Sequence, residues 1–172
     1  MKDTILGAAI EVLAIDGLNN WTVEEVANRS HCAKGLVNYH YRSKRELLGC
    51  AAETLRDDRA ARRLAAAQTH GTQALDRLWA VLVGEVESGW FSAWTSLLGA
   101  DDPLRKAASP RPADSAALAA ALARSLAVDT ELTRSGAVIQ AVLDGLQLQL
   151  LQGADTAETE EAYQRFWVTA LT

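Results

Sequence analysis

Apolar residues recur every three or four positions along most of the chain, the spacing that places them on one face of an α-helix. In residues 2–16 this face consists of Ile5, Ala9, Val12 and Leu13. Good helix formers dominate the sequence, and no run of alternating β-branched residues occurs. The pattern therefore predicts an all-α protein of about nine helices.

The limits of the expected helices come from glycines, prolines and capping residues. Gly17 and Gly153 end helices, while Thr22 and Ser43 each precede a glutamate by three positions, the spacing of a capping box. All three prolines lie in one segment, 101–113, which we expect to be an extended loop. The expected helices span about 2–16, 23–30, 34–41, 43–67, 73–87, 89–100, 114–127, 129–152 and 156–172, with Asp129 or Thr130 starting the eighth.

Charge is distributed unevenly along a chain whose net charge is −5. Residues 1–63 hold 10 basic and 9 acidic residues, the remainder holds 7 basic and 13 acidic ones, and no acid lies between Val26 and Arg45. A surface that binds DNA phosphates cannot present many carboxylates. The asymmetry suggests a basic head that contacts nucleic acid and an acidic body. A solvated helical face that happens to be basic is the alternative.

The acid-free stretch has the layout of a helix-turn-helix. Two short expected helices, 23–30 and 34–41, are joined by the three residues His31, Cys32 and Ala33 behind a supporting helix. Val37 and Tyr41, four positions apart, would face the supporting helices. The residues that would point outward are Lys34, Gly35, Asn38 and Tyr39.

These outward residues have the chemistry of a DNA-reading helix. Lys34 lies at the helix N-terminus, which enters the major groove first, and Gly35 lets the backbone approach closely. The Asn38 amide suits an adenine edge, and Tyr39 can contact a thymine methyl or donate to phosphate. The side chains placed for phosphate contacts are those of Thr22, His40 and Lys44.

The segment WTVEEVANRSHCAKGLVNYHYRSKRELL, from Trp21 to Leu48, resembles the DNA-binding domain of the TetR family of bacterial transcriptional regulators. The matching elements are Thr22-Val23, Val26-Ala27, His31-Cys32-Ala33, Lys34-Gly35, Tyr39-His40-Tyr41, Ser43-Lys44 and Leu47-Leu48. The similarity covers about residues 4–52. It implies DNA contacts from Thr22, Lys34, Gly35, Asn38, Tyr39, His40 and Lys44.

Three positions depart from the family pattern. His31 stands where the family usually has the turn glycine, and histidine tolerates the left-handed backbone better than most residues. Ala33 stands where a serine commonly caps the third helix, a loss of about 1 kcal/mol. Asn38 stands where tyrosine is common, which changes the bases that are read.

The resemblance also implies a helical body that binds a small molecule and dimerises through its last two helices. The expected helix 129–152 is apolar over a wide arc, which suggests burial on two sides, and the expected helix 156–172 has one broad apolar face. The residues that we expect at a dimer interface are Val142, Leu146, Leu150, Tyr163, Phe166 and Trp167. The alternative is burial wholly within one monomer.

The body also carries most of the tryptophans. We expect three tryptophans, one phenylalanine and one acid to line a ligand pocket. They are Trp79, Trp90, Trp94, Phe91 and Asp144. Core packing is the alternative for aromatic residues at helical spacing. The segments AWTSLLGA and LDGLQLQLL resemble the TetR subgroup of choline-responsive betaine regulators, which suggests a quaternary amine held by the aromatic rings and Asp144. We expect Glu85 and Glu87 to face solvent.

These features favour a ligand-responsive DNA-binding regulator, a repressor that a small molecule releases from a palindromic operator. We expect a DNA-binding domain over residues 1–45, a ligand-binding and dimerisation domain over 46–172, and a helix over 43–67 that couples them. A protein of the same fold that has lost operator binding and serves in interactions is the alternative.

An enzyme is not expected. The histidines lack metal-ligand spacing, no nucleophile elbow or phosphate-binding glycine loop occurs, and the acid pair in GADDPLRK suits a solvated loop. We expect no cofactor, no metal, reduced cysteines and, in the absence of an apolar span or signal sequence, a cytoplasmic protein.

Overall fold

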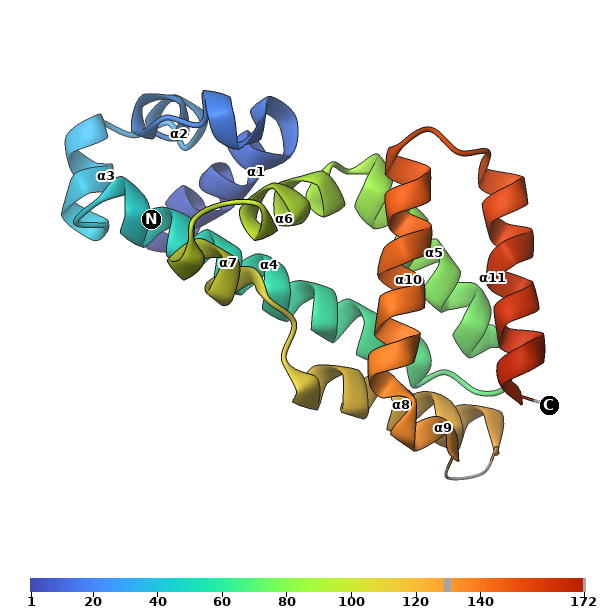
Figure 1. Ribbon diagram of the computed structural model, residues 1–172. Helices are drawn as coiled ribbons and strands as arrows, with labels where there is room; N and C mark the ends of the chain where they lie inside the picture. The colour runs from blue at the N-terminus through green and yellow to red at the C-terminus, as the bar shows by residue number, and fades with distance from the viewer. Residues whose placement is uncertain (129–130, 172) are drawn as a thin grey trace. The chain divides into compact units, whose positions relative to one another are not determined.

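The protein is all-α in the computed structural model, which describes residues 1–128 and 131–171 (Figure 1). The helices are α1 Lys2–Asn20, α2 Val23–Arg29, α3 Lys34–His40, α4 Lys44–Ala67, α5 Gln73–Glu87, α6 Trp90–Leu98, α7 Asp102–Ala108, α8 Pro112–Leu126, α9 Glu131–Arg134, α10 Gly136–Leu151 and α11 Thr156–Leu171. The predicted fold class is therefore confirmed. None of these helices, over the described part of the chain, is long and apolar enough to cross a membrane.

The helices pack as two compact units. Unit 1 comprises Met1–Asp58 and Ser88–Ser109, and unit 2 comprises Arg59–Glu87 and Pro110–Thr172. Helix α4 contributes residues to both. This division by packing groups α6 and α7 with the N-terminal helices, whereas the division by function between residues 45 and 46 stays a prediction.

Unit 1 forms around the apolar face of α1. Ile5, Val12 and Leu13 are buried there, as their spacing predicts. The fully buried Trp21 donates its indole N–H to the Ala9 carbonyl oxygen at 2.9 Å. Gly17 interrupts the helical backbone with φ 73°, in agreement with the break predicted there.

The contact between α1 and α6 requires a glycine at position 89. A Cβ atom on Gly89 would lie 2.7 Å from the Ala14 carbonyl oxygen, and its φ of 76° favours glycine as well. The close approach lets Phe91 and Trp94 of α6 fill the core of unit 1.

Unit 2 packs α5, α8, α10 and α11 around a second core. Its buried residues include Leu78, Leu82, Leu122, Leu143 and Tyr163. They come from helices far apart in the sequence, so each apolar stripe is covered by another one.

Two sequence predictions about helices are wrong. The expected loop 101–113 contains α7, because Asp101 caps that helix through the Leu104 N–H and Pro103 sits in its first turn, where no N–H is needed. Helix α8 begins at Pro112 rather than at residue 114, because a proline is tolerated in the first turn of a helix there as well.

The expected helix 129–152 is also divided. It consists of the short α9 and of α10, separated at Ser135, whose ψ of 11° departs from helical geometry. Gly136 then starts α10 where an added Cβ would lie 2.6 Å from the Ser115 carbonyl oxygen. The start expected at Asp129 or Thr130 lies outside the described residues.

Candidate nucleic-acid interface

Hydroxyl caps set the start of α2 and of α4. Thr22 accepts a hydrogen bond from the Glu25 N–H at 3.1 Å, and Ser43 accepts one from the Glu46 N–H at 3.1 Å. The Glu46 carboxylate accepts from the Arg42 N–H at 2.9 Å, one residue before the cap. Both predicted caps are therefore formed, and they fix the ends of the segment that contains α3.

The turn before α3 adopts the strained geometry that the sequence predicts. His31 has a φ of 52°, the left-handed conformation that glycine adopts most easily. Ser30 is buried and donates its hydroxyl to the Val26 carbonyl oxygen at 2.7 Å, while the Cys32 N–H bonds to the Ala27 carbonyl oxygen at 3.0 Å. These bonds hold the turn although its conformation is unfavourable for histidine.

Helix α3 starts without a side-chain cap. Ala33 occupies the N-cap position and makes no side-chain hydrogen bond, as predicted. Val37 is 1% exposed and Tyr41 is buried as well, so these two residues fix the inward face of α3. Its outward residues are the predicted ones, Lys34, Gly35, Asn38 and Tyr39.

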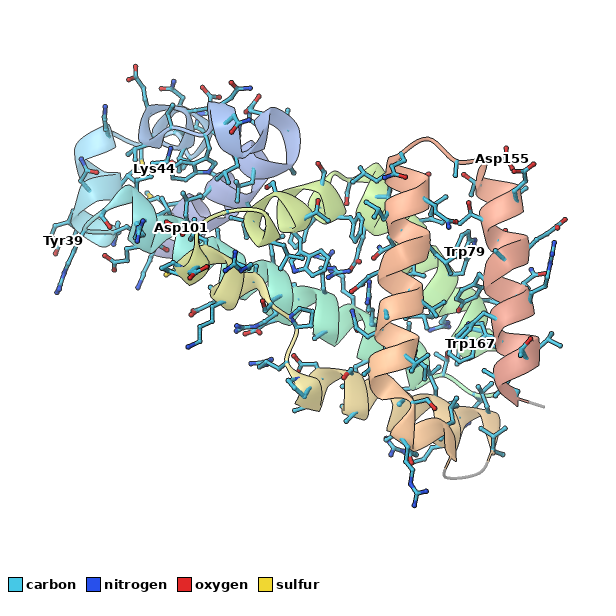
Figure 2. All side chains as sticks on the ribbon, viewed as in Figure 1. Tyr39, Lys44, Trp79, Asp101, Asp155 and Trp167 are labelled. Atoms are coloured by element: carbon cyan, nitrogen blue, oxygen red, sulfur yellow. The ribbon has the colours of Figure 1, made fainter. Side chains whose placement is uncertain are left out.

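Tyr39 is the most exposed large aromatic residue of α3. Its side chain is 81% exposed and points away from the helix, as Figure 2 shows. The His40 ring packs edge-on against it at 5.3 Å between ring centroids. An exposed tyrosine on a short helix contributes little to the core.

Lys44 is held in place by Trp21. Its ammonium group donates to the Trp21 carbonyl oxygen at 2.7 Å and lies 5.2 Å from the centroid of the indole ring. An ammonium group has three N–H donors. Lys44 can therefore keep this bond while it donates to a phosphate. Sequence reasoning missed the role of Trp21; its position directly before the capping Thr22 was the available signal.

An acid lies beside the N-terminus of α3. The Glu24 carboxylate is 3.8 Å from the Lys34 ammonium, and both side chains are mostly exposed. The acid-free interval in the sequence concealed this pair, because Glu24 belongs to α2 and only the fold brings it to α3. Glu24 lowers the positive potential where DNA phosphate would approach.

The residues predicted for a ligand pocket fall into both units. In unit 1, Phe91 and Trp94 are buried with 5.6 Å between ring centroids, and Trp90 is half-buried. The Trp94 indole N–H donates to the Ala108 carbonyl oxygen at 2.8 Å, which ties α6 to α7. In unit 2, Trp79 packs against Tyr163 at 5.2 Å between ring centroids.

Asp144 belongs to a buried ionic cluster in unit 2. Its carboxylate accepts from Arg59 at 3.0 Å, from Arg63 at 2.9 Å and from Gln140 at 2.8 Å. Burial raises the pKa of Asp144, but the guanidinium groups of Arg63 and Arg59 outweigh it and hold this pKa below its usual value. The Asp144 charge is thus already neutralised by arginine.

The other acid of the cluster is Glu85. It is 2% exposed and accepts hydrogen bonds from Arg59 at 3.3 Å and from Gln147 at 2.9 Å. The prediction that Glu85 faces solvent is therefore wrong, because the two arginines of α4 compensate its charge inside the core. Burial, followed by the neighbouring Arg63, lowers the pKa of Arg59.

The residues predicted for a dimer interface are mostly covered by their own chain. Leu146, Tyr163 and Trp167 are buried in the core of unit 2, and the partly buried members are Val142, Leu150 and Phe166. The large apolar side chains that α10 and α11 expose are Val138, Leu148, Leu151 and Val168. The spacing predicts which residues are apolar neighbours on a helix. It does not show which of them are covered by other helices of the same protomer.

Comparisons with known proteins agree with this architecture. Residues 5–49 match the sequence family described as bacterial regulatory proteins of the tetR family. No curated protein matches the chain.

Solved structures share the fold over nearly the whole chain. One from Rhodococcus sp., described as a TetR-family transcriptional regulator, has 19% identity and a TM-score of 0.77, and covers 99% of this chain and 98% of its own. The multidrug binding protein EbrR, complexed with imidazole, has 23% identity, a TM-score of 0.65 and coverages of 95% and 93%. A transcriptional regulator from Saccharomonospora viridis, in complex with choline, has 20% identity, a TM-score of 0.69 and coverages of 96% and 94%.

The fold and its helix-turn-helix define a DNA-binding transcriptional regulator. Residues 5–49 match the tetR family of bacterial regulatory proteins, and the whole chain shares its fold with solved structures that include a TetR-family regulator.

Proposed function

We propose that this protein is a ligand-responsive repressor that binds a palindromic operator as a homodimer and leaves it when a small molecule binds. The outward face of α3 carries the proposal, since it exposes Lys34, Asn38 and Tyr39 next to a hydroxyl-capped helix. The reading helices of a dimer would be about one helical turn apart, roughly 34–36 Å, which suits two half-sites.

We assign base contacts to α3 and phosphate contacts to the residues around it. Asn38 reads an adenine edge, while Lys34 and Gly35 bring the helix N-terminus into the groove. Thr22 accepts the Glu25 N–H in its cap, and its own O–H is the group that would donate to phosphate. The other contacts in this proposal come from Tyr39, His40 and Lys44.

The homodimer would form through α10 and α11. The exposed apolar residues Val138, Leu148 and Leu151 support an uncovered face on α10. With the partly buried Val142, Leu150 and Phe166 they would form a four-helix interface with a second copy. Leu146, Tyr163 and Trp167 would support that face from beneath.

The effector is an unidentified small molecule in this proposal. Family membership supports it, and two similar structures were solved with choline or imidazole bound. Of the aromatic residues expected at its site, Trp90, Phe91 and Trp94 of unit 1 remain the ones that we propose. The Asp144 carboxylate does not supply an unpaired charge for a quaternary amine, because Arg59 and Arg63 already bind it.

DNA binding to the intergenic region upstream of the protein's own gene tests the proposal. Mobility shift with footprinting at two salt concentrations should give a protected palindrome and steep salt dependence, because phosphate contacts release counterions. Asn38→Ala should mainly change sequence preference, and Lys44→Ala should weaken all sequences alike. A protein that protects no fragment in a genome-wide selection at low salt would refute operator binding.

The second candidate function is an interaction protein that has lost operator binding. The uncapped start of α3, the left-handed His31 and the acid beside Lys34 favour it. A DNA affinity that does not change with salt would support this candidate over the repressor.

A further inference from the structure

We propose that a groove between α5 and α11 in unit 2 binds an organic cation with an apolar body. Trp79, Tyr163 and Trp167 form its aromatic wall, and Asp76 and Glu160 supply its carboxylates. The groove has a volume of about 310 Å³. Pockets for small molecules start at roughly 300 Å³, so the groove suits a small molecule and is too small for a protein segment of several residues.

The aromatic wall is fixed before any ligand arrives. Trp79 and Tyr163 lie 5.2 Å apart and Tyr163 and Trp167 lie 6.0 Å apart, measured between ring centroids. The Tyr163 hydroxyl donates to the Leu75 carbonyl oxygen at 2.8 Å, which joins α11 to α5. Figure 2 labels Trp79 and Trp167 in this part of unit 2. Fixed rings lose little conformational freedom when a ligand binds.

The charge of the groove selects the ligand class. Asp76 and Glu160 are acidic, and no lysine, arginine or histidine is among the described residues that line the groove. Aromatic rings and carboxylates both attract a cation, whereas the carboxylates repel an anion. The apolar remainder of the wall, which includes Leu75 and Val168, suits a hydrocarbon body on the same ligand.

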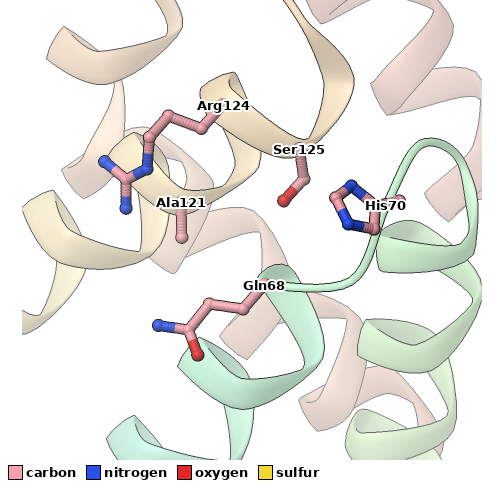
Figure 3. A pocket seen from close by; sticks show the side chains of 5 residues that line it. All are labelled: Gln68, His70, Ala121, Arg124 and Ser125. Atoms are coloured by element: carbon pink, nitrogen blue, oxygen red, sulfur yellow. The ribbon is translucent and has the colours of Figure 1, made fainter.

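A second hollow in unit 2 lacks these features. Figure 3 shows it between Gln68, His70, Ala121, Arg124 and Ser125, with a volume of about 200 Å³. None of these residues is an acid, and Arg124 carries a positive charge. This hollow does not suit a cation, so the inference concerns the groove between α5 and α11 alone.

The tryptophan indole signals in a proton–nitrogen NMR spectrum can locate a bound ligand. Two of the five tryptophans, Trp79 and Trp167, line the groove, and the remaining three belong to unit 1. Titration of the full chain with benzyltrimethylammonium should shift the signals of Trp79 and Trp167. The variants Trp79→Phe and Trp167→Phe assign these two signals.

Charge variants test why the cation binds. Asp76→Asn and Glu160→Gln should each weaken binding of benzyltrimethylammonium about two- to fivefold, the range of an exposed charge pair. Glu161→Gln is the matched control on the same helix, since Glu161 pairs with Arg165 at 3.0 Å and does not line the groove. It should leave the dissociation constant unchanged.

Three results would overturn the inference. The first is no shift of the Trp79 and Trp167 signals at cation concentrations up to about 10 mM, ten times a millimolar dissociation constant. The second is a shift confined to the tryptophans of unit 1. The third is an equal shift with benzenesulfonate, an anion of similar size. The titration contains no DNA, so its failure would leave the proposed operator binding untouched, and failure of operator binding would leave this site untouched.

Discussion

Replacement of Asp144 by asparagine would leave the buried cluster of unit 2 with two arginines and one acid. The Arg59 and Arg63 side chains are almost inaccessible to solvent, so water cannot replace the lost carboxylate easily. The Nε and Nη1 groups of Arg63 have no hydrogen-bond acceptor among the described residues, so this side chain depends on the few acceptors that reach its other nitrogen. Loss of one partner from a buried ion pair costs about 3–5 kcal/mol. Because the Asp144 side chain is 23% exposed, we expect about 3 kcal/mol, the lower end of that range.

Urea denaturation at fixed protein concentration measures this free energy of unfolding. Glu161→Gln is the control for an acid-to-amide change, because its ion pair is exposed and contributes about 0–1 kcal/mol. If Asp144→Asn falls within about 1 kcal/mol of the unchanged protein at pH 7, the cluster does not depend on this charge and the reasoning from burial fails.

The same variant has a defined dependence on pH. The folded pKa of Asp144 lies below its unfolded value of about 3.9, so its charge stabilises the fold above that pH and the contribution is lost as pH falls through the folded pKa. The difference in stability between the original protein and Asp144→Asn should therefore shrink as pH falls below about 4. A constant difference over that range would contradict the assignment.

Three further predictions concern the helix-turn-helix and the residues around it. Glu24→Gln should strengthen DNA binding about two- to fivefold at low salt by releasing Lys34, and fluorescence anisotropy at high salt should show the gain disappear. Lys44→Ala should lower the slope of log affinity against log salt by about 1, whereas Asn38→Ala should leave the slope unchanged and cost about 1–3 kcal/mol at one base position. Ala33→Ser should add the missing cap of α3 and raise the free energy of unfolding by about 1 kcal/mol, measurable by urea denaturation; no gain would mean that the hydroxyl does not reach the N–H groups of that helix.

The head could be predicted from the sequence because its signals are local. The caps at Thr22 and Ser43 use a residue three positions away, and the inward pair Val37 and Tyr41 follows from one turn of helix. His31 was identified as a left-handed residue from its place in the motif alone. Each signal lies within a few residues of the structure that it determines.

The body was predicted less well because its determinants are distant in sequence. Glu85 is buried because Arg59 and Gln147 reach it from two other helices, and no periodicity reveals such a pairing. Trp167 lies on an apolar face, but spacing does not show whether that face is covered by the same chain or by a partner. Pro103 predicts a loop because proline breaks helices, but it lies in the first turn of α7, where a helix tolerates it.

The contact between Lys44 and Trp21 has a consequence for the entropy of DNA binding. A free lysine side chain loses up to about 2 kcal/mol of rotational freedom when it is immobilised. Lys44 is already restrained by the Trp21 carbonyl and indole before DNA is present. Much of the loss of side-chain entropy therefore occurs when the protein folds and not when it binds DNA. In the proposed complex with DNA, Trp21 would therefore increase the affinity of a phosphate contact that it does not itself make.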